Sequence, residues 1–156
     1  MFENGSEILR FDCHLHTVSD KEFKYDGESD KFISSYVDKL KSEGIGVGVI
    51  TNHNKFDYEQ YKALKKAANR NGIFILPGVE LSVKEGASSV HMLVVFNPVE
   101  WICNGIDHIS RMVNALFLGI DDPGNENTCT EKDLLTVINE MDKQNKYVMF
   151  DRLSDN

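Results

Sequence analysis

Two histidines separated by one residue, His14 and His16, stand where the apolar segment 8–13 ends, and we expect that segment to be a β-strand. Side chains at positions i and i+2 of a strand lie on the same face, so both imidazoles are presented together. Two imidazoles at a strand end can bind one metal ion. The alternative is a structural pair whose rings only hydrogen-bond to neighbouring backbone.

Three later segments favour the metal. The sequence TNHN at residues 51–54 follows a second apolar segment, PGVE at residues 77–80 follows a third, and His91 opens a fourth. Each of them places a histidine or a carboxylate at the boundary of an expected strand. Imidazole and carboxylate ligands suit Zn, Mn or Fe, and the sequence does not choose between these metals.

Strand-like and helix-like segments alternate along the chain. Apolar spacing predicts strands over residues 8–13, 46–51, 73–76, 79–83, 90–96 and 147–150, and helices over residues 31–43, 58–71, 106–118 and 130–143. This alternation predicts an α/β fold with a mostly parallel sheet and covering helices. Ligands of such sheets bind at the carboxyl ends of the strands, where His16, His53, Glu80 and the loop after Phe150 fall.

Local signals set the ends of several elements. Asp57 is the expected N-cap of the second helix, and Thr130 with Asp133 three residues later forms a variant of the capping box before the last helix. Pro77 and Gly78 are expected to break the third strand, after which residues 79–83 continue in extended conformation.

Composition limits the class of protein. A chain of 156 residues with a net charge of −8 fits one domain without an overall basic field, which argues against nucleic-acid binding unless a metal cluster supplies local positive charge. The three cysteines (Cys13, Cys103 and Cys129) show no C-x-x-C spacing and are expected to be reduced thiols. No apolar run approaches the length of a membrane span, and the N-terminus does not resemble a signal peptide. We therefore expect a cytoplasmic protein.

Four motifs in order resemble those of the PHP family (polymerase and histidinol phosphatase domains), which are distorted α/β barrels with two or three metal ions. Residues 12–17 (DCHLHT) look like D-x-H-x-H-[ST], and residues 50–54 (ITNHN) are similar to a motif that usually contains T-D-H-[ND]. Residues 76–82 (LPGVELS) match P-G-x-E-[IL]-[ST], and residues 91–93 (HML) look like the strand that carries the next histidine. The first loop and the TNHN variant look most like PHP domains fused to SMC-like or AAA-like ATPases.

The resemblance implies a role for each candidate residue. His14 and His16 would bind one divalent ion, Glu80 would bridge it to a second, and His91 would bind the second. His53, with Asp20, would bind a third. The implied activity is a metal-dependent phosphoesterase that cleaves a phosphomonoester or a nucleic-acid phosphodiester, with Glu80 and His16 as the catalytic pair.

Two departures from the family pattern lead to an alternative function. Asn52 stands where the family usually has aspartate, and residues 151–154 (DRLS) follow the last expected strand where the family has a histidine. Asp151 as an oxygen ligand and Arg152 as a phosphate contact are the two available substitutes. We therefore expect one PHP-like domain over residues 1–156, truncated on its C-terminal side, that forms an incomplete barrel and covers its last strand by self-association or by its C-terminal helix. The alternative is a catalytically impaired scaffold or regulator of an ATPase domain.

Overall fold

The computed structural model describes residues 8–85, 88–120, 123–124, 127–142 and 148–151. Its main sheet has the order β1 (Arg10–Leu15), β2 (Ile45–Ile50), β3 (Phe74–Glu85), β4 (Ser88–Phe96) and β8 (Val148–Asp151), with β7 (Cys129–Thr130) also paired to β3. The pairs β1–β2, β2–β3 and β3–β7 are parallel, whereas β4 is antiparallel to β3 and β8. The predicted α/β class with a mostly parallel sheet is confirmed. The sequence resemblance implies an incomplete barrel, and within the described residues the strands form an open path.

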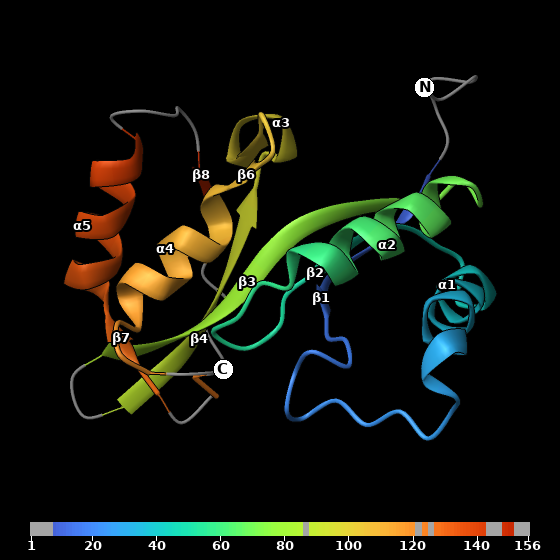
Figure 1. Cartoon of the computed structure of the whole chain (residues 1–156), viewed down its shortest axis with the longest axis horizontal. Helices are drawn as coiled ribbons and strands as arrows, with labels where there is room; N and C mark the ends of the chain where they lie inside the picture. The colour runs from blue at the N-terminus through green and yellow to red at the C-terminus, as the bar shows by residue number, and fades with distance from the viewer. Residues whose placement is uncertain (1–7, 86–87, 121–122, 125–126, 143–147, 152–156) are drawn as a thin grey trace.

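Strand β3 connects the two halves of the sheet (Figure 1). Its first four residues pair with β2 as far as Pro77, and from Gly78 onward it pairs with β4. The expected break at Pro77 and Gly78 is therefore wrong. Pro77 lacks an N–H, and it lies where one neighbouring strand ends and the other begins, so the ladder changes partner at a position that tolerates proline.

The four predicted helices are present as α1 (Phe32–Ser42), α2 (Tyr58–Asn69), α4 (His108–Leu116) and α5 (Glu131–Asp142). The structure adds a 3₁₀ turn η1 (Ser29–Lys31), a short helix α3 (Pro98–Trp101) and a hairpin of β5 (Ile102–Cys103) with β6 (Ile106–Asp107). Figure 1 shows α1 and α2 beside the β1–β2 end of the sheet, and α4 and α5 beside the end that carries β7 and β8.

The helix starts follow their caps. Asp57 accepts a hydrogen bond from the Gln60 N–H, which confirms it as the N-cap of α2. Thr130 and Asp133 make the reciprocal contacts of a capping box before α5. The expected start of the third helix at Ile106 is wrong, because Asp107 caps α4 through the Ser110 N–H and leaves Ile106 in β6 with 39% of its surface exposed.

Alternation along β3 separates the core from the candidate site. Val79, Leu81 and Val83 are buried in the hydrophobic core that the helices cover. Glu80 and Ser82 lie on the other face because successive side chains of a strand point to opposite sides, and both are fully buried. A carboxylate has thus been placed inside the protein, on the face of β3 opposite to its apolar core residues.

The last described strand, β8, is antiparallel to its neighbour β4. The sequence predicts a strand over residues 147–150 in a mostly parallel sheet, but β8 pairs antiparallel with β4, and Tyr147 lies outside the described residues. The register aligns Asp151 with Leu93 of β4, and Leu93 with Glu80 of β3. The backbone of Asp151 therefore lies two strands away from Glu80 in the same row of the sheet.

We predict that Gly78→Ala destabilises the protein, because an added Cβ would lie 2.7 Å from Val49 Cγ1 and 2.9 Å from the carbonyl oxygen of Val94. Crowding of this kind costs about 1–3 kcal/mol, and urea unfolding measures it. Val49→Ala in the same chain should recover only part of the loss, because the carbonyl remains. An unchanged unfolding free energy for Gly78→Ala would show that the strands can move apart freely.

Candidate metal centre

The structure brings together all six residues that the sequence proposed as metal ligands. The first lies in β1, and the next two lie in the residues that follow β1. The fourth lies in the segment after β2, the fifth in the middle of β3, and the sixth in β4. In chain order they are His14, His16, Asp20, His53, Glu80 and His91. Glu80 is not at the carboxyl end of its strand, but it faces the end of β2 through a bridge between His53 and Glu80.

Glu80 is the centre of the cluster. Its Oε2 atom lies 2.6 Å from His14 Nε2, 3.3 Å from His16 Nε2 and 3.2 Å from His53 Nε2. Its Oε1 atom lies 2.5 Å from His91 Nδ1. One fully buried carboxylate thus contacts four imidazoles, which come from β1, the residue after β1, the segment after β2, and β4.

Asp20 holds two of these imidazoles from the opposite side. Its Oδ2 atom lies 2.7 Å from His16 Nδ1 and 3.0 Å from His53 Nδ1, and it also accepts the backbone N–H of His53 at 2.8 Å. The two rings stack with their centroids 4.7 Å apart and their planes inclined by 20°. Each ring therefore bridges Asp20 at Nδ1 and Glu80 at Nε2.

The carboxylates and one histidine have shifted pKa values. Burial alone would raise the pKa of Glu80, but hydrogen bonds from His16 and His14 and the charges of His14 and His53 lower it to about 2. Burial also opposes ionisation of Asp20, yet the backbone N–H groups of His53 and Glu22, together with His16, lower its pKa to about 2. Burial would lower the pKa of His16, and its contacts with Glu80 and Asp20 raise it above 6.5 instead.

A set of buried polar side chains supports the loop that carries these ligands. Asn52 accepts the Thr17 N–H at 2.8 Å and contacts the Thr17 hydroxyl, which also bonds to Gln60. The described side-chain hydrogen bonds of Asn52 all go to Thr17 and none goes to a histidine. Asn52 therefore fixes the backbone directly after His16.

Two further residues were not predicted from the sequence. Tyr36 of α1 donates its hydroxyl to the His16 carbonyl at 2.8 Å. Asn54 adopts a left-handed φ of 49°, accepts the Ser82 N–H, and donates its amide to the carbonyls of Gly124 and Asn127. The position of Asn54 directly after His53 was the only sequence signal for it, whereas the apolar spacing of α1 predicted Tyr36 only as a packing residue.

The donor atoms fit a divalent metal. Three groups have donor atoms within 4.8 Å of one another: His14, His16 and Glu80; His16, Asp20 and His53; and His53, Glu80 and His91. Glu80 Oε1 is buried and makes no hydrogen bond of regular geometry, despite its proximity to His91. Imidazole nitrogens converging on a carboxylate form a donor set typical of Zn, Mn or Fe sites. The cluster could therefore hold metal ions.

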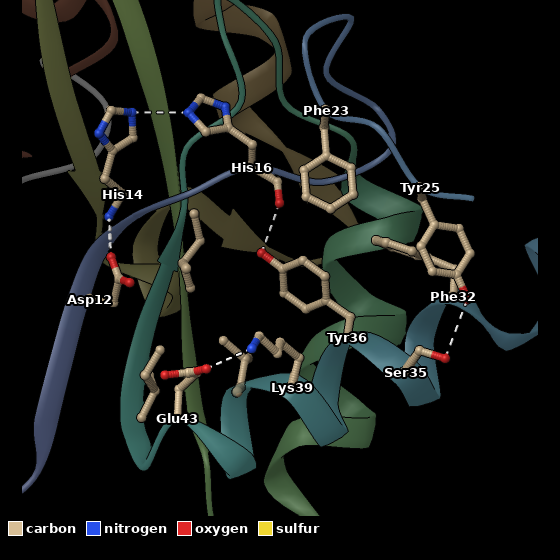
Figure 2. A pocket seen from close by; sticks show the side chains of 13 residues that line it. Asp12, His14, His16, Phe23, Tyr25, Phe32, Ser35, Tyr36, Lys39 and Glu43 are labelled. Atoms are coloured by element: carbon tan, nitrogen blue, oxygen red, sulfur yellow. Dashed lines mark hydrogen bonds and ion pairs between the residues drawn. The ribbon is translucent and has the colours of Figure 1, made fainter. Parts of the chain in front are cut away.

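A pocket adjoins the cluster. Figure 2 shows His14 and His16 at one end, Lys39 and Glu43 at the other, and aromatic rings along one side. Its volume is about 480 Å³, and its lining comes from β1, the loop after it, α1 and the start of β2. The two histidines belong to both the pocket and the cluster, so a molecule in the pocket would reach the ligand set.

The remaining residues that the sequence analysis singled out lie outside the cluster or outside the described residues. Cys13 is a partly buried free thiol and belongs to none of the described metal-binding groups. Arg152 lies outside the described residues, and for Asp151 only the backbone register is described. Among the described helices none is both long and apolar enough to cross a membrane.

No protein-family profile matches the chain, and no curated protein is a match. Among solved structures, the chain is similar to a provisionally assigned metal-dependent phosphoesterase from Bifidobacterium adolescentis, with 22% identity, a TM-score of 0.48 and coverage of 68% of this chain and 32% of that one. It is also similar to an amidohydrolase from Chromobacterium violaceum with bound sulfate and no metal, at 24% identity, a TM-score of 0.45 and 68% and 31% coverage. The chain spans about a third of both proteins.

We predict that Asp20→Asn weakens metal binding without changing the number of bound ions. Carboxylates that orient a liganding histidine through its second nitrogen typically contribute about 10–100-fold to affinity. Calorimetric titration with Zn²⁺ or Mn²⁺ gives both affinity and stoichiometry, and Asp57→Asn, a cap replacement outside the cluster, serves as the control. Loss of one ion per chain would instead show that Asp20 is a ligand, as the family resemblance implies.

We also predict that the chelator-treated protein is more stable at pH 6 than at pH 3 or pH 8. Asp20 and Glu80 have pKa values lowered to about 2 from 3.8 and 4.5, so they stabilise the fold above pH 4.5 and lose this effect as the pH falls toward 2. His16 has a pKa raised above 6.5, so its contribution is complete below pH 6.5 and is lost as the pH rises through the raised value.

Urea midpoints at the three pH values test this profile. His16→Gln should flatten its basic side, because the variant has no imidazole to deprotonate at that position. Equal midpoints at pH 6 and pH 8 for the unaltered chain would contradict the assigned direction of the His16 pKa shift.

Proposed function

We propose that this chain is part of a metal-dependent phosphoesterase of the PHP type. The observation that carries the proposal is the contact of four imidazoles with the single buried carboxylate of Glu80. A buried carboxylate would be paired in many proteins, but four histidines around one exceed what its charge requires. Each unprotonated ring presents a nitrogen lone pair, and this excess of donor atoms is what a metal centre needs.

The residues divide into ligands and supports. His14 and His16, through Nε2, and Glu80 would hold one ion; Glu80 and His91 would hold a second, with His53 within reach of both. When bound, such ions supply Lewis-acid polarisation of a phosphate and lower the pKa of water. Glu80 keeps its negative charge at neutral pH because its pKa is about 2, so it is available to bind a cation without first losing a proton.

The protein orients the histidine ligands and shields the two carboxylates from water. Asp20 fixes the orientation of His16 and His53, and Tyr36 and Asn52 hold the carbonyl and the N–H of the peptide group between His16 and Thr17. His14 and His91 have side chains that are 42% and 43% exposed, whereas those of Glu80 and Asp20 are 1% exposed. A substrate therefore approaches from the side of His14 and His91, with the carboxylates shielded behind them.

The choice of a phosphate ester as substrate comes from the sequence motifs, and metal identity and number also remain part of the proposal. The association with an ATPase domain stays a prediction of the sequence resemblance. A catalytically impaired module would keep the metal and lack turnover, so activity measured on the metal-loaded chain separates it from the phosphoesterase.

We predict that Glu80→Gln removes both tight metal binding and any phosphatase or phosphodiesterase activity. The substitution keeps the shape of the side chain and removes the charge that faces four imidazoles, so the loss of affinity should exceed the roughly 10–100-fold typical of a supporting residue. Elemental analysis after dialysis and hydrolysis assays in Mn²⁺ or Zn²⁺ provide the two readouts.

His16→Ala should have the same effect, and His108→Ala is the matched control because His108 begins α4 and belongs to none of the described metal-binding groups. Hydrolysis that persists when Glu80→Ala and His16→Ala are combined would exclude a metal mechanism at this cluster. An unaltered chain that binds metal and hydrolyses no phosphate ester would favour the impaired module.

A further inference from the structure

We propose that the pocket beside His14 and His16 binds the organic part of the substrate, and that this part is an uncharged group carrying an aromatic ring. The proposal rests on the proposed function, because it assigns the substrate class of the same site. The pocket has about 480 Å³ of space, within the usual range for small-molecule sites. It is continuous with the candidate metal centre through the two histidines (Figure 2).

The wall of the pocket is chemically suited to a ring. Phe23, Tyr25, Phe32 and Tyr36 contribute aromatic side chains to the lining. Phe32 lies with its ring centroid 6.1, 5.2 and 5.4 Å from those of Phe23, Tyr25 and Tyr36, so the four rings form one cluster. Aromatic groups stack or pack edge-to-face on such a surface and gain binding free energy beyond that of burial, whereas aliphatic chains gain only the free energy of burial.

The position of this wall is fixed by burial and by a hydrogen bond to the metal-site loop. Phe32 is 3% exposed, and Tyr36 is held by its hydroxyl bond to the His16 carbonyl. The same bond links the aromatic wall to a candidate metal ligand. A ring seated on the wall therefore lies at a set position relative to the phosphate that the metal ions would hold, which is how binding of a remote group assists the reaction.

The charges of the pocket exclude a second anionic group. Lys39 is the only lysine or arginine in the described lining, and its ammonium is 2.6 Å from Glu43. Asp12 and Glu43 add two carboxylates to the lining. A nucleic-acid strand carries a phosphate on each nucleotide and needs unpaired cations, so these charges favour a phosphomonoester over a nucleic-acid phosphodiester.

The test compares phosphomonoesters whose leaving alcohols are of similar acidity, so that intrinsic reactivity does not decide the result. We expect the metal-loaded chain to hydrolyse 2-phenylethyl phosphate with a kcat/KM at least about tenfold above that of methyl phosphate, given the discrimination that burial of apolar groups provides. Equal kcat/KM values for the two esters would overturn the proposal while leaving the phosphoesterase intact.

A substitution that fills the pocket, with a control at the neighbouring residue, provides a second test. Ser35 is exposed on α1 and lines the pocket, while its neighbour Ser34 is equally exposed and does not. Ser35→Trp should reduce kcat/KM for 2-phenylethyl phosphate about tenfold and leave methyl phosphate within about twofold, and Ser34→Trp should change neither. An unchanged preference in Ser35→Trp would show that the ring binds elsewhere.

A binding measurement separates this proposal from the proposed function. 2-Phenylethanol lacks the phosphate, so its effect on the NMR signals of Phe23 and Tyr36 depends on the pocket and not on metal or turnover. We expect shifts that Ser35→Trp abolishes and Ser34→Trp retains. Shifts without hydrolysis of any ester would support the pocket and contradict the phosphoesterase, whereas an absence of shifts in the unaltered chain would contradict the pocket.

Discussion

The burial of the Glu80 carboxylate is the constraint on which the rest of the site depends. A charged group with no exposed surface is costly unless it is paired, and here the partners come from β1, β4 and the segment after β2. The four imidazoles that contact Glu80 provide this pairing and more donor atoms than one carboxylate needs. The geometry of the cluster therefore depends on where the sheet places Glu80.

That placement depends on the change of partner along β3. Because Pro77 ends the pairing with β2 and Gly78 begins the pairing with β4, residues just beyond this point face both the end of β2 and the middle of β4. Glu80 lies two residues past Gly78 and can meet His53 on one side and His91 on the other. A side chain at Gly78 would separate these strands. The close approach of the strands at Gly78 therefore also sets the position of Glu80 as a candidate ligand.

Much of this arrangement could be predicted from the sequence. Periodicity located α1, α2 and most strands because their apolar residues meet one continuous core. Ligand-type residues at strand boundaries indicated five members of the cluster, and the family resemblance added Asp20. The continuous β3 and the hairpin before α4 could not be predicted, since pairing partners decide whether Pro77 interrupts a strand and whether Ile106 is helical. The role of Tyr36 was equally hidden, because an aromatic residue on an apolar helical stripe gives no sign that its hydroxyl reaches His16.

The contacts within the cluster involve the same nitrogen atoms that a metal ion would bind. The nitrogens that would bind a cation now contact Glu80 and Asp20, and the raised pKa of His16 shows that the proton stabilises the same geometry that the metal would use. A proton and a metal ion would therefore compete for one set of nitrogen atoms. Metal binding must release protons, so affinity should increase with pH as the metal-free fold loses the contribution of His16. The two carboxylates serve both states, and this explains why they, rather than the exposed histidines, are the most deeply buried members of the cluster.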